Sequence, residues 1–196
     1  MNTYVSWEEQ WALFAEDFRE GKAHIDLTRF GGNATLQLLP GPGFGDLSHP
    51  TTNLMLQLMK GRIKNHPILD IGCGSGILTL AVLLLGASSS VGIDIDLEAL
   101  EHAKQNAALN HLPSCFTSTL PPYEDNTILL MNMILPEQKI VMKEPLKGRL
   151  WIVSGILTEQ REIYLALTKT WGWQLIEEKE REGWLGMVFR FPAIQM

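Results

Sequence analysis

Three glycines at alternating positions, Gly72, Gly74 and Gly76, have the spacing of a tight turn that can bind a ligand through its main chain. Glycine adopts left-handed backbone conformations at little cost, and its lack of a side chain lets a ligand approach the main chain. An apolar segment at residues 68–71 runs directly into these glycines, which is typical of a buried strand that ends in a tight turn. A second apolar segment ends at Asp94, about 20 residues further on, where a carboxylate commonly holds a ribose. The pattern therefore predicts half of a nucleotide-binding βαβ unit.

The sixth position of this turn distinguishes between classes of nucleotide. Dinucleotide-binding turns follow the pattern G-x-G-x-x-G, whereas the sixth position here is Ile77. Residues 70–76, Asp-Ile-Gly-Cys-Gly-Ser-Gly, instead resemble the first motif of Rossmann-like methyltransferases that use S-adenosylmethionine. That cofactor carries an ammonium and a sulfonium, which the carboxylate of Asp70 attracts, whereas the same carboxylate would repel a pyrophosphate. Backbone N–H groups at the start of the following helix suit its methionine carboxylate.

Composition and charge limit the classes of protein that this sequence fits. Its 196 residues, 45% of them hydrophobic, suffice for one globular domain, with or without an N-terminal extension. The net charge of −6 and the lack of a Lys/Arg run argue against binding to bare nucleic acid. Cys73 and Cys115 lack metal-ligand spacing, so reduced thiols and no metal are expected. The N-terminus lacks the features of a signal peptide, and residues 77–85 are too few to span a bilayer, so we expect a cytoplasmic protein with no membrane partner.

Residues 1–45 are predicted to form a helix and a β-hairpin that pack on the body of the protein. The helix begins after an N-cap at Ser6 and ends near Gly21. Residues 23–29 and 34–39 alternate as strands around a Gly-Gly-Asn turn. Aromatic residues at helical spacing are expected to form one packed face, with a wall that faces a substrate as the alternative: Trp7, Trp11, Phe14 and Phe18. Residues 46–196 are then the cofactor-binding catalytic domain.

A stiff loop precedes the glycine turn in the sequence. Residues 40–43 are all Pro or Gly, and Pro50 suits the first turn of a helix that Ser48 or His49 caps. A long loop inside a compact domain is usually functional. Two interpretations of His49 follow, one as a base or substrate contact and the other as a structural helix cap.

Helices and strands alternate through the rest of the sequence. Helices are predicted at residues 97–110, 137–144 and 158–170, and strands at residues 115–119, 127–131, 150–153, 173–178 and 184–191. Asn132 follows one of these strands, and open α/β sheets bind ligands at the carboxyl ends of parallel strands, so Asn132 is a candidate site residue. With the glycine motif, this arrangement predicts a Rossmann-like, seven-stranded class I methyltransferase fold. The sheet is expected to be mostly parallel, with helices on both faces and a closing β-hairpin.

Four separated motifs make the resemblance narrower. They are the loop Gly43-Phe44-Gly45 through Thr52, the glycine motif with Asp94, the segment Asn132 to Leu135, and the segment Ser154 to Leu157. This order resembles the PrmA family, which methylates amino groups of ribosomal protein eleven of the large subunit. Two departures stand out. Residues 46–48 are Asp-Leu-Ser where the family has roughly Thr-Gly-Thr, and the chain is too short to include the family's separate recruiting domain.

The resemblance implies a set of functional residues and a reaction. The expected cofactor-binding residues are Thr51, Asp70, Gly72, Cys73, Gly74, Gly76, Asp94, Ile95 and Asn132, and the expected catalytic residues are Asn132 and His49. Asp94 would hold the ribose, and Asn132 would orient an amine for direct methyl transfer, with acceleration from alignment. The expected acceptor is a protein such as a ribosomal protein; the sequence does not indicate an oligomeric state. An RNA or small-molecule methyltransferase and a catalytically silent cofactor-binding domain remain as alternatives.

Overall fold

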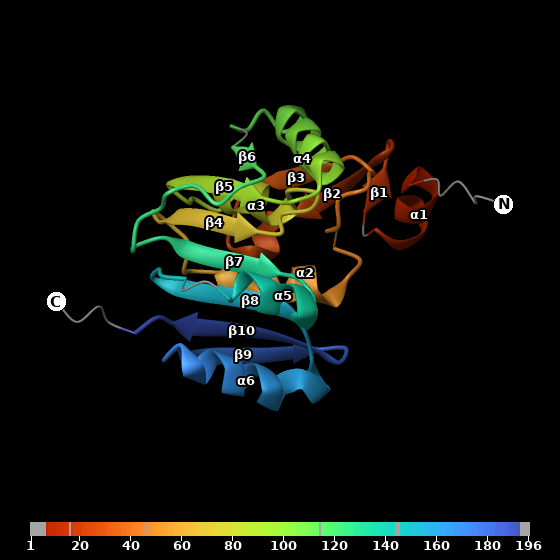
Figure 1. Ribbon diagram of the computed structural model, residues 1–196. Helices are drawn as coiled ribbons and strands as arrows, with labels where there is room; N and C mark the ends of the chain where they lie inside the picture. Colours follow the sequence, from red (N-terminus) through yellow and green to blue (C-terminus); the bar gives the residue numbers. More distant parts are fainter. Residues whose placement is uncertain (1–6, 16, 46, 114, 144–145, 193–196) are drawn as a thin grey trace.

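A seven-stranded sheet forms the centre of the protein in the computed structural model, which describes residues 7–15, 17–45, 47–113, 115–143 and 146–192 (Figure 1). The strands stand in the order β6-β5-β4-β7-β8-β10-β9. Their bounds are β4 (Pro67–Ile71), β5 (Ser89–Ile93), β6 (Phe116–Thr117), β7 (Ile128–Asn132), β8 (Leu150–Leu157), β9 (Gln174–Arg181) and β10 (Trp184–Arg190).

The sheet is parallel except for β10. β4 pairs in parallel with β5 and β7, and β8 continues the parallel set, whereas β10 lies antiparallel between β8 and β9. The β9–β10 hairpin turns at Glu182 and Gly183, both with positive φ (53° and 80°), as a tight two-residue hairpin requires. The predicted closing hairpin is therefore confirmed; β10 begins at Trp184 as predicted, and β9 extends to Arg181, closer to the turn than expected.

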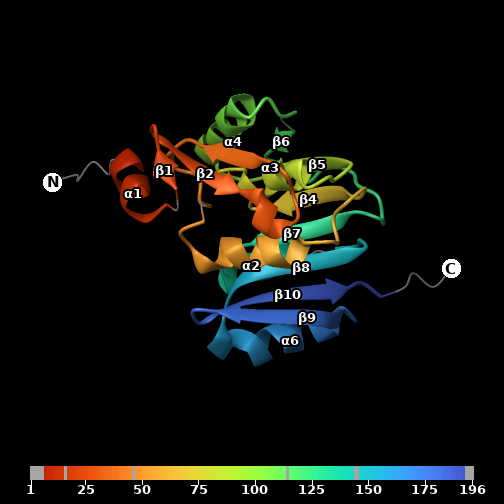
Figure 2. The same ribbon diagram turned by 180° about the vertical axis from the view of Figure 1, so that it is seen from behind.

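Helices cover both faces of the sheet because apolar side chains alternate along its buried strands. On one face, Ile68, Leu130 and Ile152 join a core cluster with α2 (Pro50–Met59) and α3 (Ile77–Leu84). On the other face, Leu69, Met131 and Val153 join a cluster with residues of α5 (Leu135–Val141) and α6 (Arg161–Thr170). Figure 2 shows α2 in front of the sheet, whereas α5 lies in front in Figure 1. The predicted class of fold, a mostly parallel sheet with helices on both faces, is confirmed.

The N-terminal elements form a small antiparallel sheet in the order β1-β2-β3. The elements are α1 (Trp7–Phe14), β1 (Phe18–Arg19), β2 (Lys22–Asp26), the 3₁₀ helix η1 (Leu27–Phe30) and β3 (Thr35–Leu38). The prediction of a helix that reaches Gly21 is wrong, because Phe18 and Arg19 pair with Ala23 and Lys22 as a strand. The strand predicted at residues 23–29 ends at Asp26, whose carboxylate accepts the Thr28 N–H and caps η1. The proposed cap at Ser6 lies outside the described residues.

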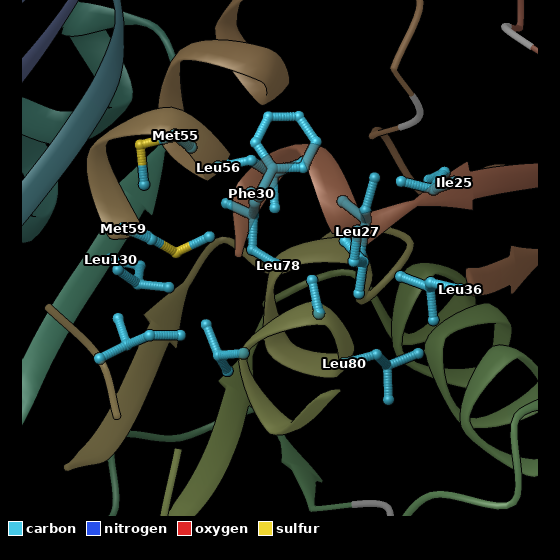
Figure 3. Packing of buried hydrophobic residues seen from close by; sticks show 14 of the residues in the cluster. Ile25, Leu27, Phe30, Leu36, Met55, Leu56, Met59, Leu78, Leu80 and Leu130 are labelled. Carbon is cyan, nitrogen blue, oxygen red and sulfur yellow. The ribbon is translucent and has the colours of Figure 1, made fainter. Parts of the chain in front are cut away.

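One hydrophobic core joins these N-terminal elements to the rest of the protein. Figure 3 shows Ile25, Leu27 and Leu36 packed toward side chains of α2 and α3, including Leu56 and Leu80. The expected aromatic face is only partly present: Trp11 is buried and Phe14 is 68% exposed, while the side chain of Trp7 is outside the described part. Residues 23–38 thus share their core with the main sheet, and the division of the chain at residue 45 stays a prediction.

Several element boundaries differ from the predicted ones. α4 (Leu97–Leu109) has nearly its predicted extent, and Asp96 caps its start. β6 is shorter than predicted. α5 begins at Leu135 because Pro136 suits the first turn of a helix. β8 extends through Leu157, so residues 154–157 belong to a strand rather than to a connection, and a short 3₁₀ helix, η2 (Thr158–Gln160), precedes α6.

Candidate active site

A cavity of about 580 Å³ opens at the carboxyl ends of β4, β5 and β7. The loop before α2 covers one side of it, and α5 and the start of α4 border the other sides. Seven of the predicted site residues line this cavity: His49, Thr51, Gly72, Gly74, Asp94, Ile95 and Asn132. The remaining three, Asp70, Cys73 and Gly76, are not among the lining residues.

The glycine turn at the cavity is left-handed at each of its glycines. Gly72, Gly74 and Gly76 have φ of 75°, 52° and 80°, a region that side chains disfavour. A Cβ at Gly72 would lie 2.2 Å from the sulfur of Met133, and one at Gly74 would lie 2.4 Å from the Phe44 carbonyl oxygen. Glycine is therefore required both by the backbone conformation and by the close approach of two neighbouring loops.

Asp94 stands at the end of β5 with its carboxylate braced by the main chain. One oxygen accepts the Gly74 N–H (2.9 Å) and the other accepts the Asp96 N–H (3.0 Å). Asp96 itself caps α4 by accepting the Glu98 N–H at 2.9 Å. Because each carboxylate oxygen can accept more than one hydrogen bond, Asp94 retains capacity for the hydroxyl groups of a ligand.

Asp70 and Cys73 lie behind the cavity wall. The Asp70 carboxylate is 1% exposed and accepts the Thr79 hydroxyl at 2.6 Å. Its other oxygen has no hydrogen-bond partner within the described part of the chain, and burial raises the pKa of this carboxyl to about 7. Burial also raises the pKa of the Cys73 thiol, so this cysteine stays protonated and is a poor nucleophile.

Asn132 combines a position at the cavity with an unused acceptor. It is the last residue of β7, the strand that lies beside β4 in the centre of the sheet. Its side-chain oxygen is buried and has no hydrogen-bond partner among the residues that the structure describes. Since buried polar atoms are nearly always paired, this oxygen is suited to accept a hydrogen bond from a ligand.

His49 acts as a helix cap and also forms part of an aromatic wall. Its Nδ1 accepts the Thr51 N–H (3.4 Å) and lies 2.8 Å from the Thr51 hydroxyl oxygen. Its ring stands edge-on between Phe44 and Trp184, with centroid distances of 5.4 and 5.1 Å. Both interpretations of His49 therefore retain structural support. Phe44 lies in one of the motifs quoted above but was not predicted as a site residue. Trp184 was not predicted either, because it is 140 positions from Phe44 and only the sheet topology brings it to the cavity.

Polar residues of α4 hold the loop that covers the cavity. His102 accepts the Gly43 N–H at its Nδ1 (3.2 Å), and its Nε2 lies 2.7 Å from the Leu39 carbonyl oxygen. Burial lowers the pKa of His102, which favours the neutral ring that this pairing needs. Ser75 of the glycine turn donates its N–H to the Phe44 carbonyl (2.8 Å). The covering loop and the glycine turn are therefore fixed against each other and against α4.

Neither a metal cluster nor a membrane span is found within the described ranges. No three His, Cys, Asp or Glu side chains gather there in a way that could hold a metal ion. No helix of that part of the chain is long and apolar enough to cross a bilayer.

The strand order, with an antiparallel strand inserted next to the edge, and the ligand cavity at the carboxyl ends of the parallel strands define a class I methyltransferase fold. The ribosomal protein L11 methylase of Lactobacillus delbrueckii subsp. bulgaricus has a similar structure, with a TM-score of 0.67 and 28% identity over 79% of this chain and 83% of that one. M. capricolum TrmK, solved with S-adenosylhomocysteine, shares the fold alone, at a TM-score of 0.58 and 15% identity over 73% of this chain and 70% of that one.

The chain belongs to the family described as "Ribosomal protein L11 methyltransferase (PrmA)", whose family model matches residues 23–192. A ribosomal protein L11 methyltransferase of Pseudomonas paraeruginosa is 41% identical over an alignment of 165 residues that covers 76% of this chain and 54% of the relative. A protein of the same name from Neisseria meningitidis serogroup B is 37% identical over 160 residues, covering 79% and 54%. The chain therefore spans about half the length of these curated relatives.

Proposed function

We propose that this chain binds S-adenosylmethionine in the cavity and methylates an amine of a protein, with a ribosomal protein as the expected acceptor. The observation that supports this best is the cavity itself, where Gly74, Asp94 and Asn132 meet in a member of the PrmA family. Relatives at about 40% identity carry the name of a ribosomal protein L11 methyltransferase. The same proposal assigns the protein to the cytoplasm, where ribosomal proteins are available.

The residues at the cavity fit the chemical groups of this cofactor. The braced carboxylate of Asp94 would accept the ribose hydroxyls, and the left-handed glycine turn leaves main-chain atoms open to the methionine part. Ile95, which is 91% exposed at the mouth of the cavity, offers apolar surface to a flat purine ring. Burial disfavours the charged form of Asp70, just behind the turn, and the positive groups of a bound cofactor would in turn favour its ionised, attracting form. When bound, the cofactor supplies an electrophilic methyl group.

The chain would align and desolvate the acceptor amine. The unpaired side-chain oxygen of Asn132 would accept a hydrogen bond from the amine and fix its approach. The aromatic wall of Phe44, His49 and Trp184 would exclude water, which lowers the pKa of an ammonium group and favours its loss of a proton to solvent.

Charge at the cavity favours a cationic acceptor over a nucleic acid. The charged side chains among its described lining residues are Asp94, Asp96 and Glu137, and that lining contains neither Lys nor Arg. A carboxylate-lined entrance attracts a lysine or an N-terminal amine and repels phosphate groups. This charge pattern supports the protein acceptor and disfavours the RNA alternative.

Calorimetric titration tests the cofactor assignment. We expect the purified protein to bind S-adenosylhomocysteine with micromolar affinity and to give no heat with NAD at the same concentrations, since Ile77 occupies the position of the third dinucleotide glycine. Binding of NAD together with no response to S-adenosylhomocysteine would contradict the proposal.

A further inference from the structure

A chain of buried hydrogen bonds runs beneath the loop that follows Asn132. The indole N–H of Trp151 donates to the Tyr164 hydroxyl (3.2 Å), which donates to the side-chain oxygen of Gln138 (2.8 Å). The amide nitrogen of Gln138 then donates to two main-chain carbonyls, those of Met133 (2.6 Å) and Ser154 (2.8 Å). Trp151, Tyr164 and Gln138 are each 0% exposed. These three side chains come from β8, α6 and α5, so the network links three elements to one loop.

The chemistry of the donors fixes the direction of this network. An indole N–H can only donate, so the Tyr164 hydroxyl accepts from Trp151 and directs its own hydrogen to Gln138. Burial raises the pKa of Tyr164, which keeps that hydrogen in place at neutral pH. The oxygen of the Gln138 amide is thereby the acceptor, and both of its N–H groups are directed to carbonyls. One orientation of Gln138 satisfies every partner.

Of the two carbonyls that Gln138 holds, that of Met133 lies directly after β7 at the cavity, and that of Ser154 lies within the neighbouring strand β8. Asn132 pairs in register with Ser154, and Met133 is the next residue after Asn132. Gly155 has a φ of 88°, and a Cβ there would lie 2.1 Å from the Met133 carbonyl oxygen. The Met133 side chain packs against Gly72 on the opposite side. Met133 is therefore held both through its carbonyl and through its side chain.

We propose that Gln138, oriented by Tyr164, is a positioning residue that holds the Asn132 loop in the arrangement needed for methyl transfer. An apolar residue at position 138 would remove the side-chain donor from the carbonyls of Met133 and Ser154. The Met133 carbonyl lies in the loop after β7, so this loop would move to let it reach water. A displacement of about 1 Å at a reacting group costs about 10²-fold in rate. The expected effect of Gln138 on methyl transfer rests on the proposed function, whereas its expected effect on the loop does not.

Three variants separate positioning from general stability. Gln138→Met keeps a side chain of similar length and removes both donors. Tyr164→Phe keeps Gln138 but removes the hydroxyl that orients it, and with that hydroxyl the acceptor of the Trp151 N–H. Thr168→Val is the matched control, because Thr168 is buried on α6 and donates only within its own helix, to the Leu165 carbonyl (3.1 Å). Hydrogen exchange is measured on peptides that cover residues 131–142, alongside the affinity for S-adenosylhomocysteine and the kcat and KM of methyl transfer.

We expect Gln138→Met to raise exchange in residues 131–142 and to lower kcat by about tenfold or more, with cofactor affinity and the KM of the acceptor within about twofold. Tyr164→Phe should give a smaller change in the same direction, and Thr168→Val should change neither quantity. Exchange and kcat in Gln138→Met equal to those in Thr168→Val would overturn the inference. If exchange rises as expected while the wild-type protein transfers no methyl group, the positioning of the loop is supported and the proposed function is refuted.

Discussion

Replacement of Asp94 by alanine should weaken cofactor binding far more than it destabilises the fold. The carboxylate would contribute charged hydrogen bonds to ribose hydroxyls, and their loss costs about 1.5–3 kcal/mol, or about ten- to hundredfold in affinity. The same substitution removes acceptors from the N–H groups of Gly74 and Asp96. The Asp96 N–H is exposed and can bind water instead, so the loss of unfolding free energy should be only about 1 kcal/mol.

A second substitution separates the charge of Asp94 from its structural role. Asp94→Asn keeps a side-chain oxygen that can accept the Gly74 N–H, so this variant should recover most of the stability while its affinity for the cofactor remains low. Asp96→Asn is the matched control, because it removes the same charge at the cavity and asparagine also caps helices well. Its affinity should stay within about threefold of the wild type.

Calorimetry with S-adenosylhomocysteine measures these affinities, and denaturant unfolding measures the stabilities. An unchanged affinity in folded Asp94→Ala would refute the assignment of Asp94 to the ribose. A large loss in Asp96→Asn alone would assign that role to Asp96.

Three further predictions follow from the geometry of the cavity. Asn132→Ala should lower kcat by about 10²-fold or more, with little change in the affinity for S-adenosylhomocysteine in calorimetry. Because Asp70 has a pKa of about 7 in the folded protein and an ordinary value of 3.8, the folded state binds the additional proton between these values. Stability should therefore fall as pH rises from 4 to 7, and denaturation of Asp70→Asn should show a flatter dependence and greater stability at pH 8. Gly74→Ala should weaken cofactor affinity more than Gly61→Ala. Both glycines have positive φ (52° and 75°), but an added Cβ would meet the Phe44 carbonyl oxygen at Gly74 and nothing within 4 Å at Gly61. Equal affinities would argue against a role for the contact between Gly74 and the Phe44 loop in cofactor binding.

Local sequence signals predicted most of the fold. The glycine turn, the apolar runs that flank it and Asp94 follow one another within about 30 residues, so short-range patterns were sufficient to define the βαβ unit. Strand order depends on pairings between distant segments, so local periodicity did not predict it. The predicted helix through Gly21 failed for a related reason: the hairpin formed by Phe18 with Ala23 overrides the local helical spacing.

The cavity was predicted less completely than the fold. Residues within motifs, such as Gly72, Asp94 and Asn132, lie at the cavity as their positions at strand ends indicated. Trp184 and Gln138 belong to no motif, and only packing between elements far apart in the sequence gives them a role at the site. Asp70 was correctly placed in the strand that precedes the glycine turn, but the inward direction of its side chain follows from strand alternation that the motif alone does not describe.

Transfer of a labelled methyl group tests the central claim most directly. The protein is incubated with labelled S-adenosylmethionine and either purified ribosomal protein eleven or a cell lysate, and label is measured in protein, RNA and small molecules. We predict label in protein, as methylated amine, with the signal reduced about 10²-fold in Asn132→Ala. Label found only in RNA or in small metabolites would contradict the protein acceptor, and no label in any fraction would contradict methyltransferase activity itself.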